Sequence, residues 1–211
     1  MSTFQRHSPE RGPTPVASRI AAGVAIGLAF TVFLLNVHPF LAINEPVRAD
    51  VLVVEGWVPD YVLDRAVAEF RSGKYRRVMV SGIAAGAGQS DGSPAARYLM
   101  SKGIDPAALR VALAPETRWN RTSHMARAVS HAARQMAPVP CGVNVITLGP
   151  HARQSRLAYR RMMGSWVPVG VIAIPKDDYD PDRWWASEAG IKKTTKDFAG
   201  WAKEWLFGLR N

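Results

Sequence analysis

The sequence predicts a Rossmann-like α/β domain, a parallel sheet of about five strands with helices on both faces, preceded by one N-terminal transmembrane helix. Two patterns carry this prediction. After residue 44, short apolar runs of strand length alternate with amphipathic stretches of helical length, which is typical of a parallel sheet covered on both faces. Before that point, one uninterrupted apolar run is long enough to cross a bilayer.

The apolar run lies near the N-terminus. No Asp, Glu, Lys or Arg occurs between Arg19 and Glu45, and residues 20–35 contain a single polar side chain. The uncharged stretch continues to Ile43, so a helix of roughly 20 residues can cross the hydrocarbon layer. We therefore expect a membrane anchor over residues 20–43. A cleaved signal peptide or a buried core helix is the alternative, but residues 36–44 offer no small-x-small cleavage site.

The charges beside the anchor predict its orientation. Arginine occurs at Arg6, Arg11 and Arg19 before the anchor, and only Arg48 lies close behind it. By the positive-inside tendency the N-terminus stays in the cytoplasm. Residues 1–19, rich in Ser, Pro, Thr and Gly, then form a flexible cytoplasmic tail. The expected protein is a single-pass inner-membrane protein whose C-terminal domain lies outside the cytoplasm.

The domain expected over residues 45–211 begins with apolar runs that predict five buried strands. In order they are Val51–Glu55, Arg77–Ser81, Leu109–Leu113, Val143–Leu148 and Val169–Ile174. Apolar positions at helical spacing predict helices over Tyr61–Arg71, Pro94–Ser101, Thr122–Met136 and Ala152–Met163. The glycine-rich stretch Gly86–Gly92 follows the second strand and its third glycine falls one residue too far for a dinucleotide fingerprint, so a flexible loop is expected.

The C-terminal residues 188–211 predict a last helix. Five apolar residues are spaced for one face of it: Ile191, Phe198, Trp201, Trp205 and Leu209. The expected arrangement is a helix docked on the sheet through this face. A helix lying on a membrane surface is the alternative.

Ligands of such sheets bind beyond the carboxyl ends of the strands, and this rule selects the candidate site. The residues are Glu55 and Gly56 after the first strand, Ser81 and Gly82 after the second, Arg118, Asn120 and Thr122 after the third, and His151, Arg153 and Arg156 after the fourth. The rule also selects the stretch Pro175–Tyr179 after the fifth strand.

The chemistry of these residues favours an anionic ligand. His151 could act as an acid or base and Glu55 as a base. The guanidinium groups of Arg118, Arg153 and Arg156 could clamp the anion. The alternatives are structural roles without a ligand. His151 would cap a helix whose arginines face solvent, and Glu55 would form an ion pair with an arginine such as Arg65.

Composition excludes several classes of protein. A single cysteine, Cys141, excludes an internal disulfide and a cysteine-cluster metal site. Zinc-protease, serine-hydrolase and P-loop patterns are absent, and the acidic residues 177–182 lack the glycine and glutamate of an EF-hand. We expect no metal and no cofactor.

The formal charge of the chain is +10, from 27 basic and 17 acidic residues. Such a charge would usually indicate binding to nucleic acid. For a domain outside the cytoplasm, it fits binding to anionic lipid or to a phosphate-bearing precursor.

The segments ADVLVVEGW, VMVSG, Glu116–Ala126 and VITLGPHAR together resemble a family of Rossmann-like domains of unknown function that includes YdcF, SanA and ElyC. The resemblance covers about residues 49–175, and many members have one N-terminal membrane segment. The chain departs from the family pattern at Glu55, where a glycine is usual, and at Gln154, where an arginine is usual. The resemblance implies a role in cell-envelope or peptidoglycan biogenesis and in the permeability barrier, and one soluble relative is associated with S-adenosylmethionine.

Three hypotheses for function remain open at this point. The first is a membrane-anchored enzyme or ligand-binding domain acting on an anionic envelope precursor or small molecule. The second is a non-catalytic scaffold that recruits proteins through its Trp-rich C-terminal region. The third is a nucleotide or S-adenosylmethionine binder, which would require the domain to lie where those molecules occur.

Overall fold

The computed structural model describes residues 15–85, 89–90 and 92–208. The chain forms two compact units, Met1–Asn36 and Val37–Asn211. The helix α1 (Pro15–Leu41) begins in the first unit, and its last turn belongs to the second. Its segment Ser18–Leu41 is long and apolar enough to span a membrane. The compact domain thus includes the end of the expected anchor, because Val37, Leu41 and Ile43 are buried in its core.

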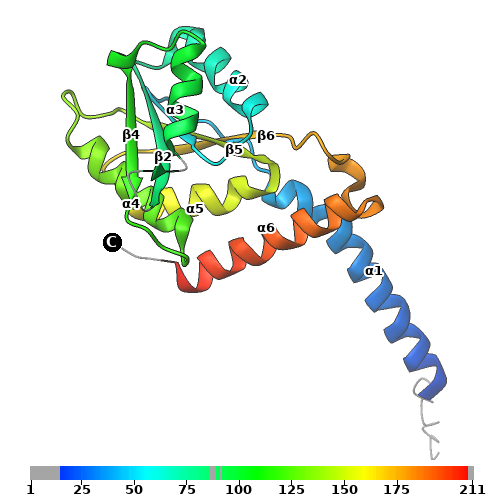
Figure 1. Ribbon diagram of the computed structural model, residues 1–211. Helices are drawn as coiled ribbons and strands as arrows, with labels where there is room; N and C mark the ends of the chain where they lie inside the picture. The colour runs from blue at the N-terminus through cyan, green and yellow to red at the C-terminus, as the bar shows by residue number, and fades with distance from the viewer. Residues whose placement is uncertain (1–14, 86–88, 91, 209–211) are drawn as a thin grey trace, which may run out of the picture. The chain divides into compact units, whose positions relative to one another are not determined.

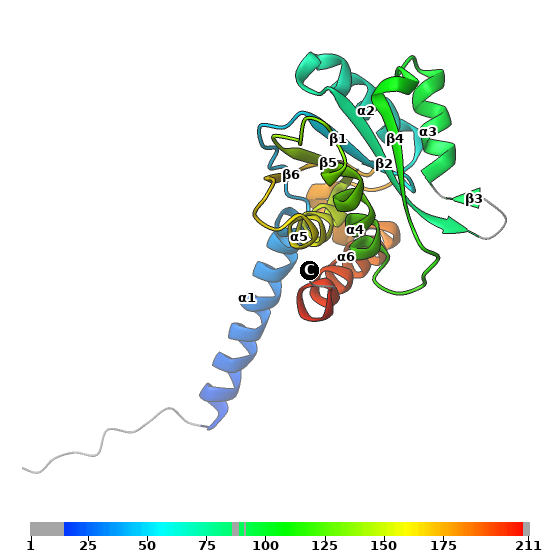
Figure 2. The ribbon, with the colours of Figure 1, turned by 90° about the vertical axis from the view of Figure 1, so that its left-hand side faces the viewer.

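Five parallel strands form the sheet of the second unit, in the order β4-β2-β1-β5-β6 (Figures 1 and 2). They are β1 (Val51–Glu55), β2 (Arg77–Ala85), β4 (Leu109–Ala114), β5 (Val143–Leu148) and β6 (Val169–Ile174). The strand order reverses between β1 and β5, as in Rossmann-like sheets. The predicted fold class and all five predicted strands are confirmed, and β2 is four residues longer than expected.

The sheet is buried on both faces, which explains its continuous apolar strands. In β1, Leu52 and Val54 belong to one core cluster, while Val51 and Val53 belong to the other. Helices α2 (Asp60–Glu69) and α3 (Gly92–Ser101) cover the first face. Helices α4 (Arg121–Arg134) and α5 (Ala152–Met163) cover the second. Short helical turns complete the connections: η1 (Phe70–Lys74), η3 (Pro106–Ala108), η4 (Gly149–His151) and η5 (Pro181–Ala186).

The glycine-rich stretch after β2 differs from the expected loop. Residues 86–88 and 91 lie outside the described residues. Gln89 and Ser90 form a short strand, β3 (Gln89–Ser90), which pairs antiparallel with the end of β2 (Figure 2). The loop prediction is wrong for these two residues, because pairing with a neighbouring strand overrides their polar composition.

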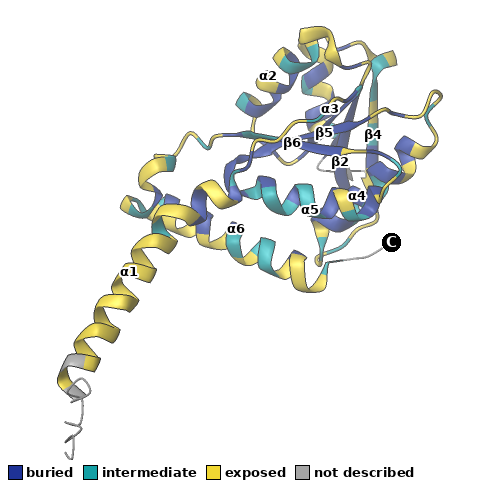
Figure 3. Ribbon diagram, turned by 180° about the vertical axis from the view of Figure 1, so that it is seen from behind, coloured by how far each residue is buried: buried dark blue, intermediate teal, exposed yellow. Residues whose placement is uncertain are grey.

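The last helix, α6 (Glu188–Phe207), exists as predicted but presents a different face to the domain. Ile191 and Trp205 are 45% and 57% exposed, and Leu209 lies outside the described residues. The buried positions of α6 are Gly190, Thr194, Asp197 and Glu204. The helix packs against α5 and the η4 turn and not directly on the sheet (Figures 1 and 3). The face of α6 that packs on the domain is polar because Asp197 and Glu204 on it bind polar groups of the domain.

The segment that follows α1 lies along the edge strand β6. Glu45 and Val171 exchange two backbone hydrogen bonds, of 2.9 and 3.1 Å. The Asn144 side-chain amide accepts from the Val47 N–H at 2.9 Å and donates to its carbonyl at 2.8 Å. A Cβ on Gly170 would collide with this segment. We call residues 45–47 the edge segment.

Candidate functional site

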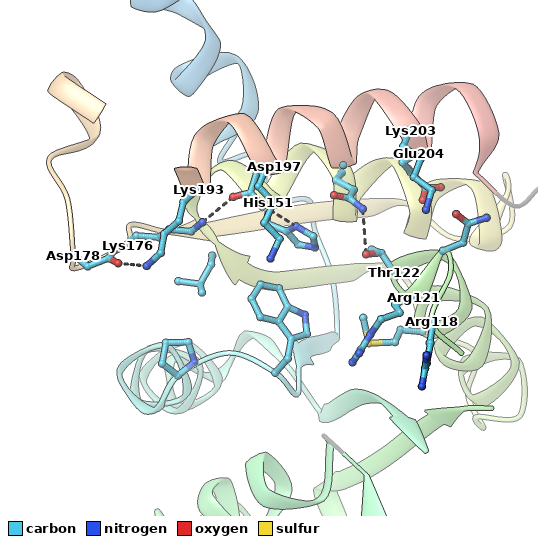
Figure 4. A pocket seen from close by; sticks show the side chains of 18 of the residues that line it. Arg118, Arg121, Thr122, His151, Lys176, Asp178, Lys193, Asp197, Lys203 and Glu204 are labelled. Atoms are coloured by element: carbon cyan, nitrogen blue, oxygen red, sulfur yellow. Dashed lines mark hydrogen bonds and ion pairs between the residues drawn. The ribbon is translucent and has the colours of Figure 1, made fainter. Parts of the chain in front are cut away.

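A cavity of about 740 Å³ opens at the carboxyl ends of β1 and β5, where the strand order reverses (Figure 4). We call it the His151 pocket. Its walls come from the segments after β1, β4, β5 and β6 and from one side of α6. The cavity therefore lies where ligands of Rossmann-like sheets bind.

A buried polar cluster forms the base of this pocket. Glu55, the last residue of β1, is fully buried and points toward α5, on the same side as Val51 and Val53. One carboxylate oxygen accepts a hydrogen bond from the Ser155 hydroxyl at 2.9 Å, and the other accepts one from the Thr147 hydroxyl. These two hydrogen bonds offset part of the free energy that burying the carboxylate costs. A neighbouring positive charge would offset more of it.

His151 is the basic side chain beside this carboxylate. It ends the η4 turn after β5, and its Nε2 lies 3.9 Å from a carboxylate oxygen of Glu55. Its Nδ1 lies 3.5 Å from a carboxylate oxygen of Asp197 on α6. The Trp57 ring meets the imidazole edge to face, with 5.0 Å between centroids. His151 is thus held between two carboxylates, and 14% of its side chain is exposed to the pocket.

Asp197 also binds Lys176, which follows β6. The Lys176 Nζ lies 2.7 Å from the second Asp197 oxygen, and the two side chains are 11% and 9% exposed. Positive and negative groups therefore alternate from Lys176 through Asp197 and His151 to Glu55. Figure 4 shows Asp197 reaching from α6 toward both cations.

This alternation sets the protonation of its members. Burial alone lowers the pKa of His151, but contact with Asp197 and the charge of Glu55 outweigh it, so the pKa lies above its ordinary value of 6.5. Burial raises the pKa of Asp197, but His151 and Lys176 outweigh that effect and hold it below 3.8. The raised pKa favours the protonated form of His151 more than an ordinary histidine does, and that form can donate a proton or attract an anion.

The rim of the pocket is basic. Its Lys and Arg residues are Arg118, Arg121, Lys176, Lys193, Lys196 and Lys203. Lys193 pairs with Asp178, and the Lys203 Nζ lies 4.8 Å from the centroid of the Trp119 ring. Within the described part of the chain, Arg118, Lys196 and Lys203 have no carboxylate partner. Arg118 and Lys196 also lack the ring contact of Lys203, so they are the two side chains most available to an anionic ligand.

Four of the residues predicted from sequence line the pocket: Arg118, Asn120, Thr122 and His151. Glu55 lies beneath it and does not line it, and its ion-pair partner is His151, not Arg65. A fully buried carboxylate cannot reach a substrate, so Glu55 can act only through His151.

The structure keeps the other predicted residues out of the pocket. Ser81 is buried and accepts a hydrogen bond from Tyr159 at 2.9 Å. Gly56 donates its N–H to the Ser81 carbonyl at 2.8 Å, and Gly82 is also buried. Ser81 thus has a structural side-chain contact, and Gly56 and Gly82 belong to the buried backbone at the strand ends.

Arg153 and Arg156 lie on a different face of α5 from the pocket. The Arg153 guanidinium stacks on the Phe40 ring at 4.0 Å, and Arg156 pairs with Glu45 at 2.7 Å. The expected single anion site of His151 with both arginines is therefore not formed. The reason is helical geometry, because residues two or five positions apart do not share a helix face.

Sequence reasoning missed Trp57 and the wall from α6, whereas Lys176 lies in the stretch after the fifth strand that the strand-end rule selects. The residues Gly190, Thr194, Asp197 and Glu204 form a stripe at helical spacing, with two carboxylates beside a glycine and a threonine. That stripe was the available indication that α6 docks through a polar face. On this face the Ser123 hydroxyl of α4 lies 2.8 Å from both carboxylate oxygens of Glu204 and donates its one hydrogen bond to that carboxylate.

The described residues contain no group of three or more His, Cys, Asp or Glu side chains that could hold a metal ion. Comparison with models of known protein families gave no match, and no curated protein matched the chain.

Proposed function

We propose that the chain is a membrane-anchored cell-envelope protein of the YdcF, SanA and ElyC kind, whose His151 pocket binds or processes an anionic, phosphate-bearing precursor. One observation carries the proposal: the imidazole of His151, held between two carboxylates, lies in a cavity with a basic rim, at the carboxyl edge of a parallel sheet. Guanidinium and ammonium groups around such a cavity favour phosphate.

In this proposal Arg118 and Lys196 bind the phosphate oxygens, because no carboxylate within the described residues neutralises them. Trp57 offers an aromatic face for the remainder of the ligand. His151 donates a hydrogen bond to the phosphate. If the ligand is processed, His151 is the proton donor to the oxygen that leaves phosphorus, water supplies the attacking oxygen, and solvent restores the proton.

Asp197 and Glu55 are positioning residues in this scheme. Asp197 orients the imidazole and keeps it charged, and Lys176 holds Asp197 in place. Glu55 provides the second negative charge from below. A base role for Glu55 is replaced by this one, because its carboxylate is fully buried.

The apolar segment Ser18–Leu41 supports the anchor, and the arginines before it support a domain outside the cytoplasm. A reporter fused after Asn211 tests this orientation. Activity of an enzyme that works only outside the cytoplasm is the expected result. Activity of a reporter that works only inside it would reject both the orientation and the envelope role.

Ligand binding is tested with the full chain in neutral detergent. The panel contains phosphorylated cell-wall precursors, their non-phosphorylated counterparts, nucleotides and S-adenosylmethionine. We expect binding that requires the phosphate and that weakens in Arg118→Gln but not in Arg97→Gln, an exposed arginine of α3. Preference for S-adenosylmethionine or a nucleotide would support the third hypothesis, and absence of all binding would support a scaffold.

A further inference from the structure

A second cavity, of about 460 Å³, is separate from the His151 pocket and shares no lining residue with it. It is lined by residues of α5, α6 and the last turn of α1. Its cations are the four arginines Arg153, Arg156, Arg160 and Arg161, and its aromatic side chains are Phe40, Trp201 and Trp205. We call this cavity the arginine groove.

The groove carries more positive than negative charge. Arg156 pairs with Glu45, and its Nε is buried without a hydrogen-bond partner. Arg161 contacts the Glu204 carboxylate at 3.5 Å and donates to the Trp205 carbonyl at 2.9 Å. Two carboxylates thus face four guanidinium groups among the described residues. Guanidinium groups hold more N–H donors than these contacts use, so the groove can still bind an anion.

The remaining two arginines are the least compensated. Arg153 donates to the Phe40 carbonyl and stacks on the Phe40 ring, and neither contact neutralises its charge. Arg160 is exposed and has no ion-pair partner within the described residues. Both lie on one face of α5, together with Arg156, because residues at i, i+3 and i+7 share a helix face.

Apolar surface adjoins these charges. The Phe40 and Trp201 rings pack edge to face, with 4.9 Å between centroids. Trp205, Leu206 and Phe207, at the end of α6, are 57%, 54% and 70% exposed. Arginine beside exposed tryptophan is typical of side chains at the boundary between lipid and water.

The location of the groove next to the end of α1 indicates which kind of anion it binds. Phe40 belongs to the segment Ser18–Leu41, which is apolar enough to span a membrane. If this segment is the anchor proposed above, on which the inference rests, the groove opens where the chain leaves the bilayer. Lipid headgroups are the anions concentrated at that level.

We propose that the arginine groove binds the phosphodiester headgroup of an anionic phospholipid, with Trp201 and Trp205 against its glycerol and upper acyl chains. Arg153 and Arg160 contact the phosphate. The site is independent of the ligand of the His151 pocket, since the two cavities have no residue in common.

The test uses the full chain in neutral detergent micelles with short-chain phosphatidylglycerol, short-chain phosphatidylcholine or inorganic phosphate, and measures retained ligand by native mass spectrometry. We expect phosphatidylglycerol to bind more tightly than phosphatidylcholine. Arg153→Gln and Arg160→Gln should each weaken its binding about fivefold, the contribution of one basic residue near an anionic surface. Arg97→Gln and His151→Gln should leave it unchanged.

Three outcomes would overturn the proposal. Equal binding of the two lipids would remove the preference for anionic headgroups. Binding unaffected by Arg153→Gln and Arg160→Gln together would place the lipid elsewhere. Inorganic phosphate that displaces the lipid at equal concentration would show a free-phosphate site. Failure of the anchor is a separate result: the chain would then stay in solution without detergent, whatever the lipid measurements show.

Discussion

The His151 pocket and the arginine groove both border α5 and both are basic, but they compensate their charges differently. In the pocket, the cations His151 and Lys176 contact carboxylates that are at most 9% exposed. In the groove, Arg156 and Arg161 contact carboxylates, but Arg153 stacks on a ring and Arg160 has no ion-pair partner among the described residues. Buried carboxylates fix the orientation and protonation of one imidazole, which suits chemistry. Rings and carbonyls leave guanidinium charge available, which suits binding of a charged surface.

The largest effect should come from removing the carboxylate that balances a cation in each region. Glu55→Ala should lower the free energy of unfolding by about 3–5 kcal/mol, because it leaves a buried imidazolium and two hydroxyl groups without their partner. Glu45→Ala, which removes a carboxylate that is 50% exposed, should cost less than about 1 kcal/mol of ion pairing. Denaturant unfolding in detergent measures both.

Glu116→Gln, at an exposed loop position without a described contact, serves as the control and should stay within about 0.5 kcal/mol of the parent. Equal losses for Glu55→Ala and Glu45→Ala would contradict the distinction drawn between the two regions.

His151→Gln should weaken binding of a phosphorylated ligand in the pocket by roughly 1.5–3 kcal/mol, the scale of a hydrogen bond to a charged group. The pKa of His151 is raised on folding, so its contribution to stability is complete below pH 6.5 and is lost as pH rises through the raised value. Unfolding measured across this range should show that loss in the parent and not in His151→Gln. A parent curve that rises with pH over the same range would contradict a raised pKa of His151.

Removing the cations of each cavity in turn tests whether the two binding sites are independent. Arg118→Gln with Lys196→Gln should weaken the pocket ligand by roughly 1–3 kcal/mol and leave lipid binding unchanged. Arg153→Gln with Arg160→Gln should do the reverse. Since the two sets share no contacts, all four changes together should be additive within about 0.5 kcal/mol. Titration calorimetry for the soluble ligand and native mass spectrometry for lipid give the two affinities, and a larger coupling would mean that the sites communicate.

The smallest effect is expected within the pocket itself. Lys193 and Asp178 form a pair whose side chains are 41% and 38% exposed, so Lys193→Gln should change stability by at most about 1 kcal/mol. Lys176→Gln should cost clearly more, because Asp197 is 9% exposed and would lose one of its two cations. Thermal melting of the two variants makes the comparison, and equal costs would show that burial does not govern these pairs.

Most of the fold could be predicted because buried parallel strands are apolar throughout. The predicted limits of β1, β5 and β6 agree with the structure, as do those of α5. The strand β3 could not be predicted, since two polar residues carry no pattern of their own. Its pairing with β2 depends on a contact in space.

Only part of the candidate site could be predicted from the sequence. Residues directly after strands, such as Arg118 and His151, were found because strand ends converge at one edge of the sheet. Asp197 was not, because its position depends on where α6 docks. Arg153 was assigned wrongly to the site, since closeness to His151 in sequence does not mean a shared face on a helix.

The edge segment has a consequence for association between copies of this domain. An uncovered edge strand offers its N–H and C=O groups to any other strand, and such pairing leads to aggregation. On β6, Val171 already exchanges both its backbone hydrogen bonds with Glu45. The edge segment therefore occupies part of the place where the strand of a second copy would add, and Gly170, which has no Cβ, leaves room for this close approach. At Val171 the edge of the sheet is consequently closed to a strand from a neighbouring molecule.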